Sequence, residues 1–240
     1  MNVSEKEYLL KIEKSVGRTI NKYSLIGSGE KVAVALSGGI DSLLLLETIT
    51  LRRKRLPISY EVFAIHILTE KTGQQIDLDF LKNFCQKLSV PLFIEEAKFD
   101  LNTEKSVCFL CSWHRRKHIF DFAERMNCKK IAFGHNLDDA IETLIMNMSY
   151  NGTISSLPPK LSLFNGKVEI IRPLLMLTKE EIKQYADIQK FPQEYKECPY
   201  SKDNSREKAR SIIKMMSQGD SKIKRNIFKS MQNIHKEYLP

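Results

Sequence analysis

Long apolar runs are missing from this chain of 240 residues, since none approaches the roughly 20 residues that a helix needs to span a bilayer. Residues 1–14 are charged and amphipathic, and they lack the apolar core of a signal peptide. Internal repeats and low-complexity segments are missing too. These absences predict a cytoplasmic protein without a membrane partner, and the length suits one α/β domain with an extension.

Cysteine is scarce, and none of the five precedes Cys85. An odd number in a chain expected in the cytoplasm argues against a disulfide framework, and it favours metal binding or thiol chemistry for clustered cysteines. Cys108 and Cys111 form a cluster with C-x-x-C spacing, and Cys198 lies far downstream before a proline. Cys85 and Cys128 fall within a helix pattern and beside a strand, which predicts buried core thiols.

The three remaining cysteines are compatible with several kinds of site. The Cys108–Cys111 pair could be half of a zinc site, a redox pair, or two ligands of an iron–sulfur cluster. In a zinc site with all three cysteines, His114 could be the fourth ligand. With only three cysteines, a 4Fe-4S cluster keeps one iron open for an external ligand.

Acidic residues are in the minority, with 29 against 38 basic residues and a net charge of +9. Most of the excess lies in residues 201–240, where ten bases accompany four acids. A concentrated basic excess is typical of a surface that faces a polyanion, and RNA or DNA is the leading candidate.

Short apolar runs alternate with helical patterns along the chain, which predicts a doubly wound parallel sheet with ligands beyond the carboxyl ends of its strands. Five strands are expected, at residues 31–36, 60–67, 90–95, 130–133 and 169–171. Helices are expected at residues 8–23, 43–51, 76–88, 114–126, 138–148 and 178–189. Residues 150–167, with glycine, serine and two adjacent prolines, predict a long loop.

A glycine-rich loop, Ser37-Gly38-Gly39-Ile40-Asp41-Ser42, joins the first strand to the first helix of the sheet. Its glycines let backbone N–H groups approach an anion, and the helix adds its positive end. The two serine hydroxyls can donate to phosphate, and Asp41 suits the site if Mg²⁺ lies between carboxylate and phosphate. The ending is not Gly-Lys-Ser/Thr, which excludes a Walker-type loop. The alternative is a plain turn between strand and helix.

A second motif, Gly134-His135-Asn-Leu-Asp138-Asp139, follows the expected strand at 130–133 and continues to Glu142-Thr143. Gly134 permits a close backbone approach, and His135, Asp138 and Asp139 are candidates for nucleotide or Mg²⁺ binding and for proton transfer. The structural alternative makes Asp138 a helix N-cap and Glu142 a solvated acid.

The basic run Arg115-Arg116-Lys117 follows Cys111 closely. It is either a solvated helix face or a clamp for phosphate or an RNA backbone.

The loop at Ser37–Ser42 resembles the signature of the PP-loop enzymes, which split ATP between its α and β phosphates. These enzymes adenylate an oxygen on a carbonyl-type carbon and let a nucleophile displace AMP. The whole chain resembles the TtcA-type tRNA 2-thiolation enzymes, a PP-loop group with a 4Fe-4S cluster, over roughly residues 25–215. The resemblance rests on Ser37–Ser42, Cys108–Cys111 with Arg115 and Arg116, residues 134–139 with Glu142 and Thr143, Asn147, residues 157–161, residues 172–174, and Cys198 with Pro199.

The resemblance implies an α/β fold of the Rossmann-like PP-loop ATP pyrophosphatase type with helical N- and C-terminal extensions. Together with the helical spacing near the N-terminus and the basic charge after residue 196, it divides the chain into an N-terminal helix at 1–24, the PP-loop domain at 25–196 and a basic helical appendage at 197–240. Ser37, Gly38, Gly39, Asp41 and Ser42 would hold ATP phosphates and Mg²⁺, Ile65 and His66 would hold adenine, and Gly134 would approach the nucleotide. Asp139 and Arg115 would stand at catalytic positions, and Cys108, Cys111 and Cys198 would ligate the cluster.

The implied reaction adenylates the C2 oxygen of a pyrimidine, a cytidine in the tRNA anticodon loop, and replaces it with sulfur delivered through the cluster. The expected partners are tRNA and a sulfur donor, either a cysteine desulfurase or sulfide. We also hypothesise that the N-terminal helix and basic tail cradle tRNA and that the chain forms a homodimer.

Two departures from the family pattern bear on this assignment. Ile40 stands where TtcA enzymes have lysine, which removes one phosphate contact. The uridine-thiolating relatives have N-terminal zinc-binding cysteine pairs, which this chain lacks. A persulfide-type thiolase, a uridine-specific thiolase and a zinc-containing nucleic-acid-binding module remain alternatives, whereas an amidating or lysidine-forming ligase gives the three cysteines no role.

Overall fold

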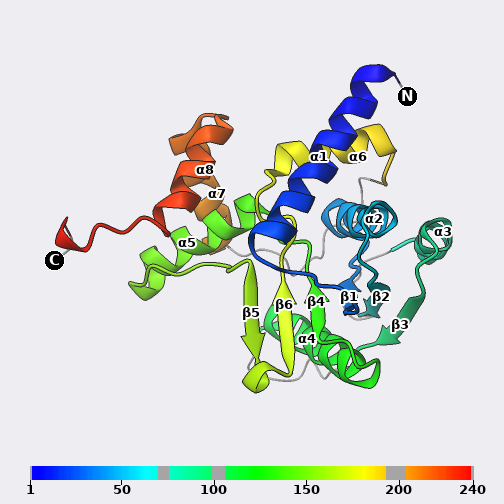
Figure 1. Ribbon diagram of the computed structural model, residues 1–240. Helices are drawn as coiled ribbons and strands as arrows, with labels where there is room; N and C mark the ends of the chain where they lie inside the picture. The colour runs from blue at the N-terminus through cyan, green and yellow to red at the C-terminus, as the bar shows by residue number, and fades with distance from the viewer. Residues whose placement is uncertain (1, 70–75, 99–105, 193–203, 239–240) are drawn as a thin grey trace.

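The computed structural model describes residues 2–69, 76–98, 106–192 and 204–238 (Figure 1). Its helices are α1 Val3–Lys22, α2 Ile40–Arg55, α3 Leu78–Leu88, α4 Val107–Arg125, α5 Leu137–Asn151, α6 Lys179–Gln189, α7 Asn204–Ser217 and α8 Ser221–Ser230. Its strands are β1 Lys31–Ala35, β2 Glu61–Leu68, β3 Leu92–Glu96, β4 Lys130–Ala132, β5 Lys160–Leu163 and β6 Val168–Ile171. Two short 3₁₀ turns are η2 Phe164–Gly166 and η3 Lys236–Tyr238.

One sheet organises the molecule, with strand order β3-β2-β1-β4-β6-β5. The pairs β3–β2, β2–β1, β1–β4 and β4–β6 are parallel, and the pair β6–β5 is antiparallel. The predicted doubly wound parallel sheet is therefore confirmed. The predicted number of five strands is wrong, because the sheet has six. The additional strand, β5, lies in the segment that the sequence predicted to be a long loop.

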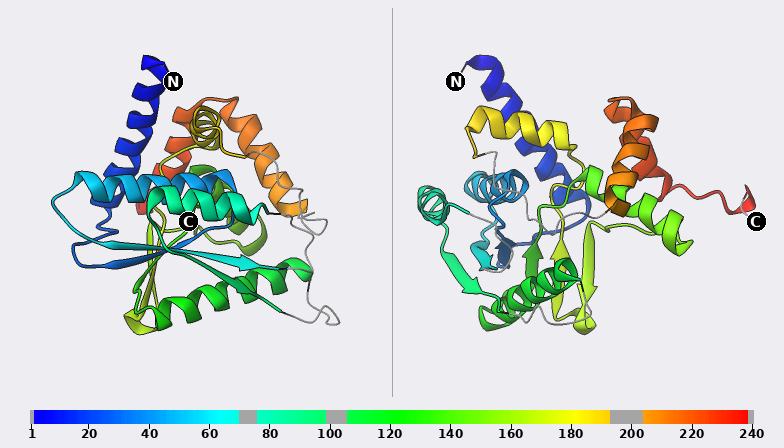
Figure 2. Two further views of the ribbon diagram at one scale, coloured as in Figure 1. Left: turned by 90° about the vertical axis from the view of Figure 1, so that its right-hand side faces the viewer. Right: turned by 180° about the vertical axis from the view of Figure 1, so that it is seen from behind.

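The two faces of the sheet are covered unequally, as the turned views show (Figure 2). One face packs against α1, α2, α3 and α6 in the larger core, and the other against α4. A third, smaller core joins α5 to α7 and α8. Within the described residues, no helix is long and apolar enough to cross a membrane.

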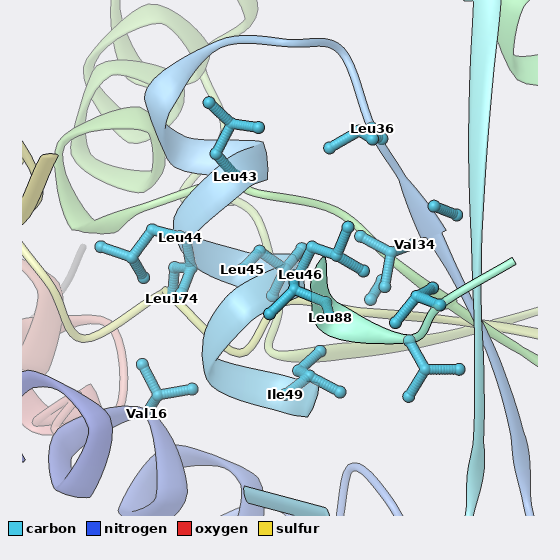
Figure 3. Close-up of a cluster of buried hydrophobic side chains, with 14 of the residues drawn as sticks. Val16, Val34, Leu36, Leu43, Leu44, Leu45, Leu46, Ile49, Leu88 and Leu174 are labelled. Atoms are coloured by element: carbon cyan, nitrogen blue, oxygen red, sulfur yellow. The ribbon is translucent and has the colours of Figure 1, made fainter. Parts of the chain in front are cut away.

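Helix α2 lies at the centre of the larger core (Figure 3). Four consecutive leucines, Leu43–Leu46, are fully buried because the sheet covers one side of this helix and α1 and α6 cover the other. Val16 of α1 and Leu174 contact the same cluster. This packing fixes the N-terminus of α2, and therefore the loop before it, against the sheet.

Helix α4 begins at Val107, seven residues before the predicted start at 114. Ser106 caps it by accepting a hydrogen bond from the N–H of Phe109 at 3.3 Å. Cys108 and Cys111 therefore stand three apart in its first turns, where that spacing places both on one face.

Candidate active site

The loop between β1 and α2 is a preformed cradle for an anion. Gly38 has φ of +91°, a conformation that side chains rarely adopt. The Ser42 hydroxyl donates to the Gly39 carbonyl at 2.8 Å and accepts from the Gly38 N–H at 3.2 Å, while the Ser37 hydroxyl donates to Ser42 at 3.2 Å. Gly39 caps α2 without a side-chain hydrogen bond, which leaves the positive end of this helix to a ligand.

The loop after β4 packs directly onto this cradle at Gly134. A Cβ at that position would lie 3.1 Å from the Asp41 carbonyl carbon and 3.2 Å from the Ser42 backbone nitrogen, a tighter contact than most side chains make. Glycine therefore lets the two motifs meet without displacing the backbone of the phosphate loop.

Asn136 links the two motifs by hydrogen bonds. Its Nδ2 donates to Asp41 Oδ1 at 2.8 Å, and its Oδ1 accepts from the Asp139 N–H at 3.1 Å. Asp139 Oδ2 accepts from the Asn136 N–H at 3.0 Å, which completes a capping box at the start of α5. Asn136 is not among the predicted site residues, although the Asn-x-x-Asp spacing after a strand is a signal for such a cap.

The Asp41 carboxyl is largely buried, and burial raises its pKa above the ordinary value. The Asn136 hydrogen bond opposes this shift, and the nearby Asp139 carboxylate adds to it. Two carboxylates this close, one of them desolvated, make a favourable position for a divalent cation.

His135 is held neutral beside the cavity. Burial lowers its pKa to about 4, with further effects from the charges of Arg172, Arg116 and Arg206. Arg172 Nε donates to His135 Nδ1 at 3.4 Å, so the proton of the neutral ring belongs on Nε2. Arg172 is itself 5% exposed, and its Nη1 donates to the Pro158 carbonyl at 2.6 Å.

His66, at the end of β2, offers an acceptor to a ligand. Its Nδ1 donates to the Leu36 carbonyl at 2.7 Å, and burial lowers its pKa, so the ring is neutral and Nε2 carries a lone pair. That Nε2 is buried and has no hydrogen-bond partner among the residues that the structure describes. A ligand amino group, such as that of adenine, fits this atom.

Arg115 and Arg116, which follow the cysteines on α4, lie on the same side of this helix as the cavity. Arg115 Nη2 donates to Thr69 Oγ1 at 2.9 Å, which anchors α4 to the end of β2. Cys108 is exposed and Cys111 is half-buried. Cys198 lies outside the described residues, among which no three His, Cys, Asp or Glu side chains gather as a metal-binding group.

A cavity of about 470 Å³ joins these elements and is of the size usual for small-molecule sites. Eleven of the predicted site residues line it: Ser37, Asp41, Ser42, Ile65, His66, Cys108, Cys111, Arg115, Gly134, His135 and Asp139. Arg116 also lines it, from α4. Ile40 is not among its lining residues and packs instead against the larger core.

Asp138 is placed differently from the other predicted ligands. Its Oδ2 accepts from the Lys179 N–H at 2.9 Å and its Oδ1 from Lys224 Nζ at 2.6 Å, so one oxygen contacts the start of α6 and the other contacts α8. Glu142 is 3% exposed and pairs with Lys179 at 3.1 Å and Arg210 at 2.9 Å. The alternative with Asp138 as N-cap and Glu142 as a solvated acid is therefore wrong, because Asn136 is the N-cap.

Comparison with known proteins places this arrangement in a family. A PP-loop domain family matches residues 9–215. The chain is 31% identical to the tRNA-cytidine(32) 2-sulfurtransferase of Geotalea uraniireducens, with 100% of this chain and 97% of the relative aligned. It is 34% identical to tRNA-cytidine(32) 2-sulfurtransferase 1 of Francisella tularensis subsp. tularensis, over 97% of this chain and 91% of the relative.

Solved structures agree on the fold. The U34-tRNA thiolase NcsA from Methanococcus maripaludis, described with its [4Fe-4S] cluster, superposes with a TM-score of 0.78 at 22% identity. The match covers 95% of this chain and 79% of that one. NAD⁺ synthetase from Burkholderia pseudomallei superposes with a TM-score of 0.51 at 13% identity, over 100% of this chain and 92% of that one. The resemblance predicted from the sequence is confirmed: the chain is a PP-loop protein and belongs to the tRNA-cytidine(32) 2-sulfurtransferase family.

Proposed function

We propose that this protein is an ATP- and Mg²⁺-dependent tRNA sulfurtransferase that converts a cytidine of the anticodon loop to 2-thiocytidine. One observation carries the proposal: the phosphate cradle, the second motif and the Cys108–Cys111 pair line one cavity. An ATP site that opens onto two thiols matches a reaction in which adenylation is followed by sulfur replacement.

The proposed roles follow from the contacts. Ser37, Ser42 and the N-terminus of α2 bind the ATP phosphates, and His66 Nε2 accepts from the adenine amino group. Asp41 and Asp139 would hold Mg²⁺, which when bound would supply positive charge against the phosphates. Because Ile40 supplies no cation, this binding relies more on backbone N–H groups, Mg²⁺ and Arg115.

The reaction has two displacements. The C2 oxygen of the cytidine attacks the α-phosphorus of ATP, and pyrophosphate leaves. Sulfur then attacks C2, and AMP leaves with the former C2 oxygen. Arg115 and Arg116 neutralise the charge that develops on the transferred group, and Asp139 accepts the proton released during substitution.

Cys108, Cys111 and Cys198 are the residues proposed to hold a 4Fe-4S cluster. The cluster would supply sulfur to the activated base through its open iron. The donor set fits, since thiolates are the usual ligands of such clusters and two of the three face the cavity.

Further assignments complete this proposal. The cytoplasm, where tRNA is modified, is the proposed location, and a cysteine desulfurase or sulfide is the proposed donor. Segments 1–24 and 197–240 are proposed to contact tRNA around a PP-loop domain at 25–196, in a homodimer. The basic excess of the C-terminal segment supports the tRNA contact.

The test combines nucleoside mass spectrometry with metal analysis. Deletion of the gene should abolish 2-thiocytidine in cellular tRNA, and complementation should restore it. Anaerobically purified protein should contain about four iron atoms per chain and absorb in the visible range. Cys111→Ser should lose iron and thiolation, whereas Cys85→Ala, at a buried cysteine in the core, should retain both.

Two results would contradict the proposal. Thiolation by iron-free protein with a persulfide on Cys108 or Cys111 would replace the cluster with a persulfide mechanism. Stoichiometric zinc, with no AMP formed from ATP and tRNA, would identify a nucleic-acid-binding module.

A further inference from the structure

A second hollow, of about 1020 Å³, lies outside the proposed ATP site. It runs between α4 and η2, the turn that joins β5 to β6, and both elements lie side by side at the same end of the sheet (Figures 1 and 2). We call it the α4 groove. The proposed chemistry assigns no role to it.

One face of α4 forms a wall of the α4 groove. Trp113, Arg116, Phe120 and Glu124 recur every three or four residues, which places them in a row along the helix. The opposite face packs on the sheet through residues such as Phe122, which is fully buried. The row therefore faces the groove and spans about 16 Å.

Two aromatic rings are displayed in the α4 groove. Trp113 is 51% exposed and Phe164 of η2 is 60% exposed. Phe164 has φ of +51°, which bulky residues rarely adopt, and its ring stands edge-on to Phe120 at 5.7 Å. Lys117 Nζ lies 5.8 Å from the Trp113 ring centroid. Exposed rings beside cations are the usual platforms on which single-stranded nucleic acids stack their bases.

The charges of the α4 groove favour a polyanion. Four bases, Arg116, Lys117, Lys129 and Lys167, line it against two acids, Asp121 and Glu124. All six side chains are exposed. Lys129 Nζ lies 3.9 Å from Glu169 Oε1, and Arg116, Lys117 and Lys167 form no ion pair with other residues that the structure describes. This excess of positive charge, beside two exposed aromatic rings, favours an RNA strand, which brings one negative charge with each nucleotide.

The floor of the α4 groove is not a reactive site. Cys128 is 3% exposed there, and burial raises the pKa of its thiol to about 11. It is a packing thiol, as the sequence predicted, and the groove offers surface for binding rather than chemistry.

The α4 groove adjoins the candidate active site at Arg116, which lines both the groove and the 470 Å³ cavity. A strand with one nucleotide in the cavity would pass Arg116 to reach the groove and η2.

We propose that the α4 groove binds the single-stranded RNA that flanks the target nucleotide, with bases stacked on Trp113 and Phe164 and phosphates at Lys117 and Lys167. This inference rests on the proposed tRNA substrate and adds the residues that select a single-stranded segment.

The test uses the full-length protein and two measurements, direct tRNA binding and steady-state thiolation. Trp113→Ala and Phe164→Ala should each raise the Kd and KM for tRNA roughly tenfold, with kcat and the KM for ATP unchanged. Trp113→Phe should restore most of the affinity. Tyr150→Ala, at a tyrosine of α5 with 56% exposure, is the matched control and should behave as the wild type. Lys117→Glu and Lys167→Glu should weaken binding and reduce its salt dependence.

The outcomes separate this inference from the proposed function. Wild-type affinity for tRNA in both alanine variants would overturn the groove assignment, whether or not the enzyme thiolates. Weakened binding in a protein that fails to thiolate any cytidine would support the groove and contradict the proposed reaction. If the variants bind tRNA normally and lose activity only when a cysteine desulfurase, not sulfide, supplies sulfur, the groove docks a protein and the RNA assignment is wrong.

Discussion

Asn136 performs two tasks with one side chain, because it caps α5 through its oxygen and holds Asp41 through its nitrogen. Asn136→Ala should lose about 1 kcal/mol from the cap and a further 1–3 kcal/mol, roughly, from a buried carboxylate left without its donor. Asn136→Ser keeps a cap but is too short to reach Asp41. Urea unfolding should therefore rank the wild type first, serine second and alanine last.

Both Asn136 variants should slow AMP formation from ATP at least tenfold, roughly, since a misplaced carboxylate affects the metal and phosphate positions together. Wild-type AMP formation in Asn136→Ser would show that the bond to Asp41 is not needed for the reaction. Equal stability of the two variants would show that the cap contributes nothing.

His135 should make the protein less stable in mild acid. Its folded pKa of about 4 lies below the ordinary value of 6.5, so between these values only the unfolded chain binds the proton. The stabilisation is complete above pH 6.5 and is lost as the pH falls, by about 2–3 kcal/mol at pH 4.5. Urea unfolding at pH 7.5 and 4.5 should show this extra loss in the wild type and not in His135→Gln. A parallel loss in both proteins would contradict the assignment.

At the residue scale, the sequence predicted the residues that line the cavity better than the residues that position them. Ser37–Ser42 and Gly134 can be recognised in the sequence, because glycine and serine at the end of a strand allow the backbone to approach an anion closely. Asn136 and Arg172 contact site residues far away in the sequence, 95 and 37 positions apart. The sequence predicts Asp138 as a ligand-binding carboxylate, but its Oδ1 accepts a hydrogen bond from Lys224. Lys224 lies 86 residues downstream, and no local pattern reveals that pairing.

At the scale of elements, a buried ion pair joins the C-terminal helix α8 to α5 and α6. Lys224 Nζ donates to Asp138 at 2.6 Å and to Glu180 at 2.8 Å, and the Lys224 side chain is 7% exposed. Lys224→Ala should therefore cost about 3 kcal/mol in the free energy of unfolding, because it leaves Asp138 buried and unpaired. Lys222→Ala, two residues away on the exposed face, should change stability by less than about 0.5 kcal/mol. Equal effects would show that the pair contributes nothing.

This pair also changes how the basic tail must be tested. Charge reversal at Lys222, Lys224 and Arg225 is the direct test of whether the basic tail binds tRNA. Lys224 is buried, and Arg225 pairs with Glu181 at 2.9 Å, so reversal at either position disturbs folding as well. Lys222, Lys208 and Lys214 are exposed and are the informative positions for RNA contact.

The errors in the predicted helices and strands have physical causes. Strand β5 alternates polar and apolar residues, but it is only four residues long, follows Pro158 and Pro159, and is exposed over three of its four residues, so no buried run marks it. The predicted start of α4 was late because its first turns are exposed around the cysteines, apart from Leu110. The central strands and α2 were found because burial on both sides demands continuous apolar runs.

At the scale of the molecule, the C-terminal helices complete the core beside the active site. Ile213 of α7 and Phe228 of α8 are 4% and 5% exposed and cover Leu137 and Ile141 of α5 (Figure 1). Arg210 and Lys224 neutralise Glu142 and Asp138, which stand on the same helix as Asp139. The appendage predicted from charge therefore also supports the second motif.

Removal of residues 204–240 should consequently destroy more than RNA affinity. Each buried apolar side chain contributes roughly 1.5–3 kcal/mol and each broken buried pair about 3–5 kcal/mol, which together approach the whole stability of a typical domain. The truncated chain should melt more than about 10 °C lower or aggregate, and it should form no AMP from ATP and tRNA. Removal of residues 232–240 alone, which begins after α8, should leave the melting temperature within about 2 °C of the full chain. A stable, AMP-forming protein that lacks α7 and α8 would show that the second motif holds its geometry without them.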